Sequence, residues 1–469
     1  MPPFNISRKE REENNGCPRI GLEIHAYLNT KEKLFCSCPA EHGAKHAKPN
    51  TNICPTCTGQ PGAKPLLPNS EAVKKVTQIG LILNCKIDEK LVFQRKHYSW
   101  PDLPKGFQNT ISGPYATPNA IKGKFEEIKI TECHLEEDPA AWNPETGEID
   151  YNRSGSPLVE IVTDPDFTSS EQVIEWLKKL LITLDYIKAI DKTSGIKADV
   201  NVSLPEKKSQ RVEIKNINSL TNIKKAIEHE IQRQSKSPVK IQETRMYDAE
   251  KNQTKLMRTK ENAQDYRFIS EPDLPALKIS KKEIEKIKSQ LPETPQTKLK
   301  KLIKKHKIEK KHAEILTKKL EIVELFEKTI QEINPKRAIP WITVELTGAL
   351  NYVKKELDQI EIKAEHFIEL LKLVETKAIT ELKAKEILRQ FIPKSFSPKK
   401  AAKENAQISN KKEIEKLTKK VIQENPKAVE DYKAGEKNAI NFLIGQVMKL
   451  SNKRADFKGA KELLERELS

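Results

Sequence analysis

The chain has 469 residues, which is too long for a single hydrophobic core and indicates two to four domains. Hydrophobic residues make up 36% and charged residues 32%, a balance compatible with a globular protein, and a formal net charge of +17 favours a polyanionic partner. No stretch approaches the roughly 18 apolar residues of a membrane span, and the N-terminal MPPFNISRKEREENN lacks an apolar signal core. We therefore expect a cytoplasmic protein without membrane association.

The first predicted element is a strand over residues 20–28, in which apolar and polar residues alternate. Ile20, Leu22, Ile24, Ala26 and Leu28 share one face. Because side chains in a strand alternate between faces, Glu23 and His25 fall together on the other face. They are candidates for a site, and an ordinary exposed polar face is the alternative.

Four cysteines follow in two close pairs, Cys36 with Cys38 and Cys54 with Cys57. Thiols stay reduced in the cytosol, so two pairs at this spacing predict a closed tetrahedral zinc site rather than disulfides. A structural zinc knuckle is favoured over catalytic zinc, because four thiolates leave no open coordination position. His42 and His46 lie between the pairs and are alternative ligands.

A helix is predicted over residues 70–83, and basic and aromatic residues gather in the segment 91–108 that follows. The members of this group are Arg95, Lys96, His97, Tyr98 and Trp100. Charge together with stacking surfaces suits a nucleotide or an RNA terminus.

Residues 131–166 carry ten Asp and Glu against one Arg, in contrast to the basic chain as a whole. If Glu136, Glu137 and Asp138 fold into the protein, their mutual repulsion requires counter-ions, which a hard cation such as Mg²⁺ would supply. The alternative is a solvated acidic loop.

An amphipathic helix is predicted over residues 168–190, with Thr168 and Glu171 as a capping box. Two strands then alternate apolar and polar residues over 196–203 and 211–215. Their polar faces carry Asp199 and Glu213, and pairing of the two strands in a curved sheet would bring these carboxylates near Glu23 and His25.

After Pro275 the pattern changes to lysine-rich helical periodicity. Residues 301–320 hold eight lysines and two glutamates, and such basic faces are available to a phosphate backbone. Residues 392–398, IPKSFSP, are predicted to be a linker before a second small helical unit over 414–469.

Several motifs resemble, in order and spacing, the B subunit of glutamyl/aspartyl-tRNA amidotransferase (the GatB family). They include GLEIHAYLNT, RKHYSWPDLPKGFQ, HLEED, DYNRSGSPLVEIVTDPD, ADVNVS, RVEIKNINS, QETRMYD, DYRFISEPDLP and FLIGQVMK. The resemblance is dense over residues 18–275, thins out, and returns at 438–468. The chain has no room for the inserted domain of the related archaeal E subunit.

The resemblance implies an α+β protein built from three parts. These are a mixed β-sheet cradle domain with a zinc knuckle at 1–292, an all-helical domain at 293–404 and a small helical YqeY-like tail at 405–469. It also implies tRNA-dependent amidation, in which ATP and Mg²⁺ phosphorylate the side chain of Glu-tRNA(Gln) or Asp-tRNA(Asn). Ammonia from a separate amidase, the A subunit, then displaces phosphate, in a heterotrimer that includes a small C subunit.

The resemblance assigns Glu23, His25, Glu137 and Glu213 to the magnesium site, with Asp199 as a further catalytic candidate. Lys96, Tyr98 and Glu136 correspond to the substrate and ATP side, and the zinc ligands are the four cysteines. Two other classes of protein are alternatives: a non-catalytic tRNA-binding scaffold, which would not need these carboxylates, and a zinc-knuckle RNA-binding protein.

Overall fold

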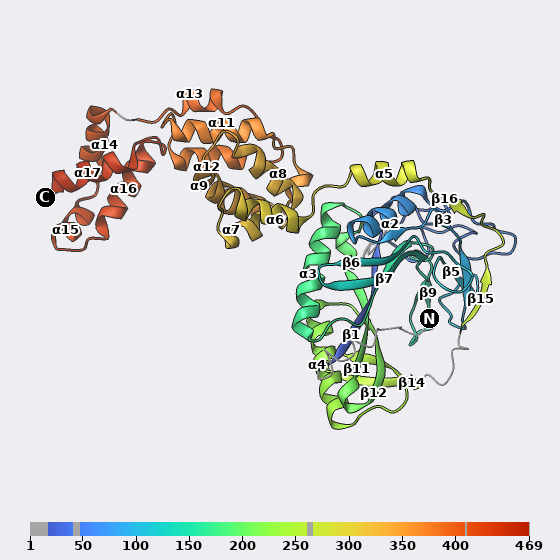
Figure 1. Cartoon of the computed structure of the whole chain (residues 1–469). Coiled ribbons are helices and arrows are strands. Elements are labelled where there is room, and N and C mark those ends of the chain that lie inside the picture. Colours follow the sequence, from blue (N-terminus) through green and yellow to red (C-terminus); the bar gives the residue numbers. More distant parts are fainter. Residues whose placement is uncertain (1–16, 41–46, 260–265, 409, 469) are drawn as a thin grey trace. The chain divides into compact units, whose positions relative to one another are not determined.

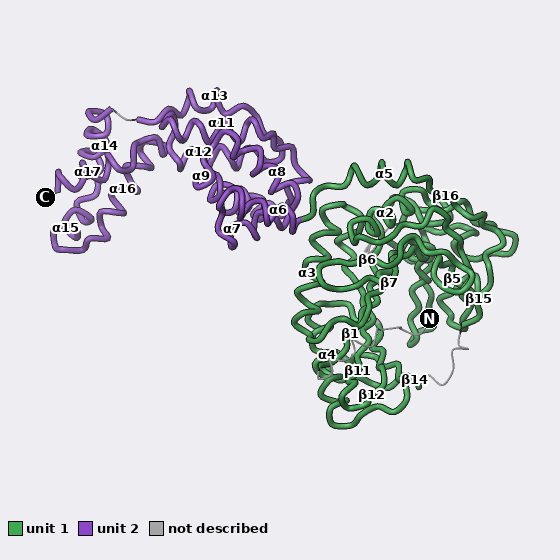
Figure 2. Tube along the Cα trace, viewed as in Figure 1, with its two compact units in different colours: residues 1–294 green, residues 295–469 purple. Residues whose placement is uncertain are grey.

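The computed structural model describes residues 17–40, 47–259, 266–408 and 410–468 (Figure 1). The chain divides into two compact units, residues 1–294 and 295–469 (Figure 2). Unit 1 is a mixture of strands and helices, and the described part of unit 2 is helical. The α+β class is therefore confirmed, whereas the division of the helical part at residue 404 stays a prediction. His42 and His46 lie outside the described residues.

Unit 1 contains sixteen described strands, most of them short. They are β1 (Arg19–Tyr27), β2 (Lys86–Ile87), β3 (Lys90–Leu91), β4 (Gln94–His97), β5 (Phe107–Thr110), β6 (Ala120–Phe125), β7 (Ile128–Glu137), β8 (Ala141–Trp142), β9 (Ile149–Asp150), β10 (Pro157–Thr163), β11 (Ile196–Leu204), β12 (Ser209–Ile217), β13 (Glu243–Asp248), β14 (Gln253–Thr259), β15 (Arg267–Ser270) and β16 (Leu277–Lys278).

Twelve of these strands form one sheet, whose main path runs β14-β13-β12-β11-β1-β10-β7-β5-β4-β15. Off this path, β6 pairs with β7, and β2 pairs with β6. Strands β12 and β13 pair in parallel, and the other pairs described in this sheet are antiparallel. Strand β1 lies between β10 and β11, so the predicted first strand is central to the sheet.

The described helices of unit 1 are α2 (Ser70–Ile82), α3 (Ser170–Tyr186), α4 (Leu220–Lys236) and α5 (Lys281–Ser289), with short 3₁₀ turns at Lys192–Ser194 and Pro205–Lys207. Helices α3 and α4 lie side by side along the sheet, and α4 packs on β11 (Figure 1). The alternation predicted for β1 is confirmed, because Ile20, Leu22, Ile24 and Ala26 are each no more than 2% exposed in the core. The opposite face of β1 is thereby left to Glu23 and His25.

The predicted capping box of α3 is wrong by one residue. Ser169 is the N-cap, and its side chain accepts a hydrogen bond from the backbone of Gln172. The Gln172 side chain instead accepts hydrogen bonds from the backbone and hydroxyl of Thr168. Two adjacent hydroxyl residues compete for the cap, and Ser169 has the extended backbone that a cap requires.

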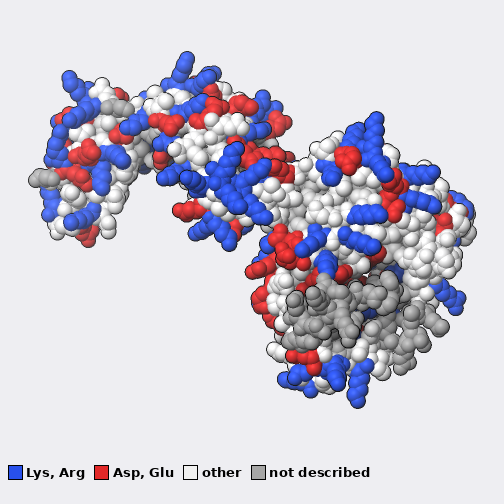
Figure 3. Space-filling view, in the orientation of Figure 1, with Lys and Arg blue, Asp and Glu red and all other residues white. Residues whose placement is uncertain are grey.

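The elements described in unit 2 are α6 (Pro295–Lys304), α7 (Lys310–Leu316), α8 (Leu320–Thr329), α9 (Pro335–Pro340), a π-helical segment (Trp341–Leu346), α10 (Thr347–Tyr352), a 3₁₀ turn (Leu357–Gln359), α11 (Ala364–Glu375), α12 (Glu381–Gln390), α13 (Lys399–Glu404), α14 (Lys411–Glu424), α15 (Pro426–Lys433), α16 (Ala439–Leu450) and α17 (Phe457–Leu468). Basic side chains project from many of these helices, with acidic ones between them (Figure 3). Among the described residues, no helix combines the length and apolarity that a bilayer span requires.

The C-terminal helices α14 to α17 surround a hydrophobic cluster of their own. Its members run from Ile408 to Leu468. The predicted linker at 392–398 connects α12 to α13, but it is tied to the helical part, because the backbones of Pro393 and Ser395 hydrogen-bond to Glu361. This segment is therefore a packed loop rather than a free linker.

Candidate active site

The polar face of the large sheet carries a row of three ionisable side chains on adjacent strands. In the strand register, His25 of β1 lies opposite Glu160 of β10, and Glu160 lies opposite His134 of β7. Residues paired across neighbouring strands present their side chains on the same face. Three segments far apart in the sequence thus place an imidazole, a carboxylate and a second imidazole side by side.

The first group of ligand atoms is the histidine–carboxylate cluster, formed by His25, Glu136 and Glu160. One side-chain donor atom from each lies within 4.8 Å of the others. Burial alone would lower the pKa of His25, but the Glu160 carboxylate raises it to about 9. Burial would raise the pKa of Glu160, yet the imidazoles of His134 and His25 hold it well below its usual value. The two carboxylates of this cluster supply oxygen ligands of the kind that a hard divalent cation such as Mg²⁺ takes.

The second group is the carboxylate cluster, formed by Glu23, Asp199 and Glu213, whose oxygens also lie within 4.8 Å of one another. Glu23 lies directly opposite Asp199 in the β1–β11 pairing. The Lys215 ammonium is 2.8 Å from Asp199 Oδ2 and 3.0 Å from Glu213 Oε1. Burial, followed by the charges of Glu160, Glu213 and Asp199, raises the pKa of Glu23 to about 7. Lys215 therefore forms ion pairs with two of the three carboxylates of this cluster.

The acidic segment 131–166 divides between the interior and the surface. Glu136, Glu137 and Asp138 are no more than 6% exposed, so the solvated-loop alternative is wrong for these three, whereas Glu145 and Glu148 are exposed. Buried carboxylates require partners. Each of the three has one, in His134 for Glu136, Lys105 for Glu137 and Arg153 for Asp138.

The structure brings together most of the predicted site residues but places Glu137 apart from the two clusters. Its Oε1 accepts hydrogen bonds from the Lys105 ammonium at 2.5 Å and the Asn109 backbone at 2.8 Å. Glu136 and Glu137 are consecutive on β7, so their side chains leave opposite faces of the strand. The assignment of Glu137 as a magnesium ligand stays a prediction, and Glu136 is the glutamate of this pair that lies beside His25.

The predicted substrate side is built around two tyrosines and a lysine. Lys96 Nζ lies 4.9 Å from the centre of the Tyr266 ring, and Tyr98 meets the same ring edge-on at 5.7 Å. The carboxylates of Glu136 and Glu160 raise the pKa of Lys96 against the effect of burial. Arg95, in contrast, is bound to Glu271 and Asp273 and supports the strand β4.

Sequence reasoning missed Glu160, His134 and Lys215 as site residues. Glu160 lies in the strand PLVEIVT, all of whose residues are buried. A single carboxylate inside an apolar run was a usable signal, because an unpaired buried charge is costly. His134 precedes Glu136 by two residues on β7, so the period of a strand alone places both on one face.

The four predicted zinc ligands lie together at the other candidate metal centre. The sulfur atoms of Cys36, Cys38, Cys54 and Cys57 are within 4.8 Å of one another, which fits the S–S spacing of about 3.8 Å around tetrahedral zinc. The buried Lys33 ammonium is 3.5 Å from Cys57 Sγ and 2.9 Å from the carbonyl oxygen of Asn52. A hydrogen bond from Cys36 and the charge of Lys33 help lower the pKa of Cys57 to about 4. The donor set fits zinc, as the sequence predicts.

Buried ionisable groups with strongly shifted pKa values gather at functional sites, and the family comparison agrees with a catalytic domain. Residues 18–285 match the GatB/GatE catalytic domain, and residues 324–468 match the GatB domain. The second match begins within the predicted helical domain rather than at residue 405.

Relatives of similar length identify the particular family. The chain is 42% identical over 468 residues to the B subunit of aspartyl/glutamyl-tRNA(Asn/Gln) amidotransferase from Methanocaldococcus jannaschii, covering 96% of this chain and 98% of the relative. It is 40% identical to the protein of the same name from Methanothermobacter thermautotrophicus, over 95% of this chain and 99% of the relative. The chain belongs to the family of aspartyl/glutamyl-tRNA(Asn/Gln) amidotransferase B subunits, which favours the enzyme component over both alternative classes.

Proposed function

We propose that this chain phosphorylates the side-chain carboxylate of Glu-tRNA(Gln) or Asp-tRNA(Asn) and completes its amidation with ammonia. A carboxylate oxygen attacks the γ-phosphorus of ATP, which forms an acyl phosphate on the tRNA and releases ADP. Ammonia then attacks the acyl carbon, phosphate leaves, and a proton is lost to give Gln-tRNA(Gln) or Asn-tRNA(Asn). Activation is needed because the charge and resonance of a carboxylate oppose direct attack by ammonia.

The observation that carries this proposal is the meeting of His25, Glu136 and Glu160 on one sheet face, with Lys96 nearby. Phosphoryl transfer depends on positioned charges more than on a covalent catalyst. When Mg²⁺ is bound by this cluster, it would neutralise charge on the phosphate oxygens. A non-catalytic tRNA scaffold has no need for these buried carboxylates.

Two lysines and two tyrosines of the site are suited to contact the reactants. Lys96 provides an ammonium group for an anionic oxygen of ATP or of the substrate carboxylate, beside the rings of Tyr98 and Tyr266. Lys215 holds Asp199 and Glu213 together at salt-bridge distances. These contacts would orient the two negatively charged reactants, whose approach is otherwise opposed by repulsion.

The ammonia is supplied by glutamine hydrolysis in a partner amidase, the A subunit, and a small C subunit completes a cytoplasmic heterotrimer. The relatives are named as B subunits, which implies that further subunits accompany them. The four-cysteine site would hold a structural zinc, because its four thiolates complete a tetrahedral shell. The Lys33 ammonium would offset part of the negative charge of such a site.

The test uses the full chain in complex with its partner proteins, and ammonium chloride replaces glutamine. ATP hydrolysis dependent on misacylated tRNA and formation of the amidated tRNA are measured for wild type, Glu160→Gln and Glu127→Gln. Glu160→Gln should lose activity by about 100-fold or more, because a candidate ligand loses its charge. Glu127, whose side chain is 89% exposed, is the matched control and should retain activity. Normal activity of Glu160→Gln would overturn the proposal.

A further inference from the structure

Thr244 of β13 touches the carboxylate cluster from a neighbouring strand. Strands β12 and β13 pair in parallel, with Thr244 directly opposite Glu213. The Thr244 hydroxyl donates a hydrogen bond of 3.0 Å to Glu213 Oε2, and Lys215 contacts the other oxygen, Oε1, at 3.0 Å. Thr244 is 1% exposed. Both oxygens of Glu213 are therefore contacted by side chains, which restricts rotation of its carboxylate.

The residues on either side of Thr244 point away from this site, toward α4. Glu243 accepts hydrogen bonds from both Arg233 and Arg245, at 2.9 Å each. Glu230 on α4 is fully buried, and Arg233 donates to its Oε1 at 2.7 Å. Consecutive side chains of a strand leave opposite faces. The contacts of Glu243 and Arg245 thus fix which way Thr244 points.

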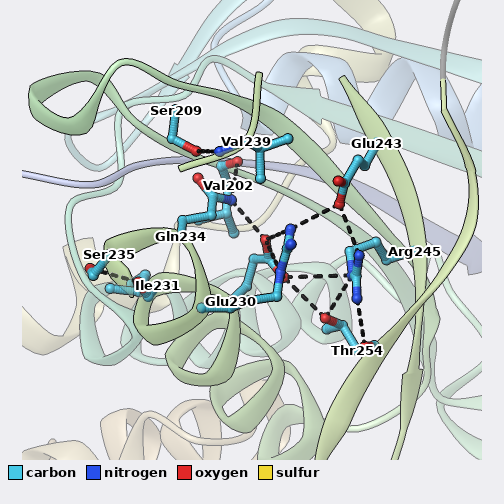
Figure 4. Close-up of polar contacts among 11 residues, drawn as sticks. Val202, Ser209, Glu230, Ile231, Gln234, Ser235, Val239, Glu243, Arg245 and Thr254 are labelled. Atoms are coloured by element: carbon cyan, nitrogen blue, oxygen red, sulfur yellow. Dashed lines mark hydrogen bonds and ion pairs between the residues drawn. The ribbon is translucent and has the colours of Figure 1, made fainter. Parts of the chain in front are cut away.

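Strand β14, which forms a hairpin with β13, also contacts Glu230 and Arg245. Thr254 of β14 donates to Glu230 Oε2 at 3.1 Å and accepts from Arg245 Nε at 2.9 Å (Figure 4). Arg245 also donates to the Thr254 carbonyl oxygen at 2.9 Å. Strand β14 ends the main path of the sheet. A hairpin at the edge of the sheet is therefore held to α4 by buried charges.

We propose that Thr244 is a positioning residue that orients Glu213 in the carboxylate cluster, and that the Glu230 network holds it in place. This role rests on the proposed function and extends it, because it gives the carboxylate cluster a share in cation binding at the phosphoryl-transfer site. Hydrogen bonds to a ligating carboxylate orient it and tune its affinity for a cation. The alternative is a purely structural role, in which the buried Thr244 hydroxyl donates to Glu213 only because a buried donor needs an acceptor.

The experiment compares Thr244→Val, which keeps the side-chain shape and removes the hydroxyl, with Thr244→Ser, which keeps the hydroxyl. Thr77→Val is the control for loss of a buried hydroxyl, because Thr77 is fully buried on α2 and donates to the Val73 carbonyl oxygen. Two quantities are measured: Mn²⁺ binding to the full chain by electron paramagnetic resonance, and the Mg²⁺ dependence of tRNA-dependent ATP hydrolysis by the complex.

For Thr244→Val we expect Mn²⁺ affinity to fall, and the Mg²⁺ concentration for half-maximal activity to rise, by about 10-fold. Thr244→Ser and Thr77→Val should stay within about twofold of wild type. In a Glu213→Gln background, Thr244→Val should add no further loss, because the two residues act through one hydrogen bond. If Thr244→Val lowers Mn²⁺ affinity as much in the Glu213→Gln background as in wild type, Thr244 has a structural role and the proposal is overturned.

The two readouts separate this inference from the proposed function. An inactive wild-type complex whose Mn²⁺ binding still depends on the Thr244 hydroxyl would reject the phosphorylation reaction and support the positioning role. An active complex in which Thr244→Val matches wild type in both measurements would reject the positioning role alone. A chain that binds no Mn²⁺ and shows no activity would reject both.

Discussion

His134 of β7 lies 3.1 Å from Glu160 of β10, at the centre of the candidate site. The same imidazole is 3.1 Å from Glu132 and 3.5 Å from Glu136, and it is 1% exposed. These are charge contacts whose angles depart from those of hydrogen bonds. Burial would lower the pKa of His134, but the surrounding carboxylates, Glu160 foremost, hold it well above its usual value. His134 is therefore a cation built into an acidic site.

Replacing His134 with Gln should destabilise the metal-free protein by about 3 kcal/mol at neutral pH, because buried carboxylates lose their cation. The histidine's folded pKa is raised, so its stabilisation is complete below its unfolded pKa and is lost as pH rises through the raised value. The pKa of Glu160 is depressed, so the contribution of Glu160 to stability is lost as pH falls through that depressed value. Urea unfolding with a chelator present, from acidic to alkaline pH, measures the difference.

Magnesium provides the control for this substitution. A divalent cation at the histidine–carboxylate cluster supplies positive charge close to Glu136 and Glu160, so saturating Mg²⁺ should recover part of the stability lost in His134→Gln. Equal stability of the variant and wild type without metal would contradict the assigned role of His134.

Replacing Glu23 should stabilise the metal-free protein, whereas replacing His134 destabilises it. The folded pKa of Glu23, about 7, lies above the ordinary value of 4.5. Between these two values the unfolded chain has lost a proton that the folded chain keeps, so stability falls as pH rises. Glu23→Gln removes this penalty. The metal-free variant should be more stable than wild type at pH 8 by about 1 to 3 kcal/mol, at about 1.4 kcal/mol per pKa unit, and similar near pH 4.5.

Magnesium should act on the stabilities of wild type and Glu23→Gln in the opposite direction to the substitution. If Glu23 contributes to cation binding, added Mg²⁺ should stabilise wild type more than Glu23→Gln at pH 8, and its effect on wild type should weaken below about pH 7 as Glu23 takes up a proton. Thermal unfolding at several pH values, with Mg²⁺ or chelator, measures both effects. An unchanged response to Mg²⁺ in the variant would remove Glu23 from the cation site.

The cysteine cluster predicts about one zinc ion per chain. Cys54→Ser should lower the zinc content measured by elemental analysis and reduce the stability of unit 1, because zinc binding is coupled to folding. Cys17→Ser is the matched control, since Cys17 is exposed and lies outside the cluster. Loss of activity in Cys54→Ser without loss of stability would instead indicate a direct role in the chemistry.

Local periodicity was sufficient to predict the strands that carry most of the site. Alternation placed Glu23 and His25 on the polar face of β1, and Asp199 and Glu213 on the polar faces of β11 and β12, as the structure confirms. Each of these strands alternates strictly enough for a period of two to decide which side chains face the core.

The partition of these residues into two clusters depends on register between distant strands, which no local pattern contains. Glu160 joins His25 because β10 pairs with β1, although 135 positions separate the two residue numbers (160 − 25). Likewise, Thr244 meets Glu213 because β12 and β13 pair in parallel, although helix α4 separates the two strands in the sequence. The resemblance assigned Glu137 to the magnesium site and Glu136 to the substrate side. Adjacent residues of a strand face opposite ways, and Glu136 is the one that lies beside His25.

The C-terminal helices α14 to α17 provide the last prediction, which concerns tRNA binding. Their hydrophobic cluster is formed almost entirely by residues after 410, with Ile408 as the exception. Deleting residues from Lys411 onward therefore removes a core together with its own helices and should leave the preceding part folded. Helix α14 alone carries Lys411, Lys412, Lys416, Lys419 and Lys420, which are suited to phosphate contacts.

We expect this deletion to raise the KM for misacylated tRNA by about 10-fold or more and to leave glutamine hydrolysis by the partner amidase intact. It should also make tRNA affinity less dependent on salt, because fewer phosphate contacts release fewer counter-ions. Filter binding of tRNA at several salt concentrations measures the slope for both proteins, and a circular dichroism melt checks that the shortened chain is folded. A folded deletion variant with the affinity and salt slope of the full chain would place tRNA recognition entirely before residue 411.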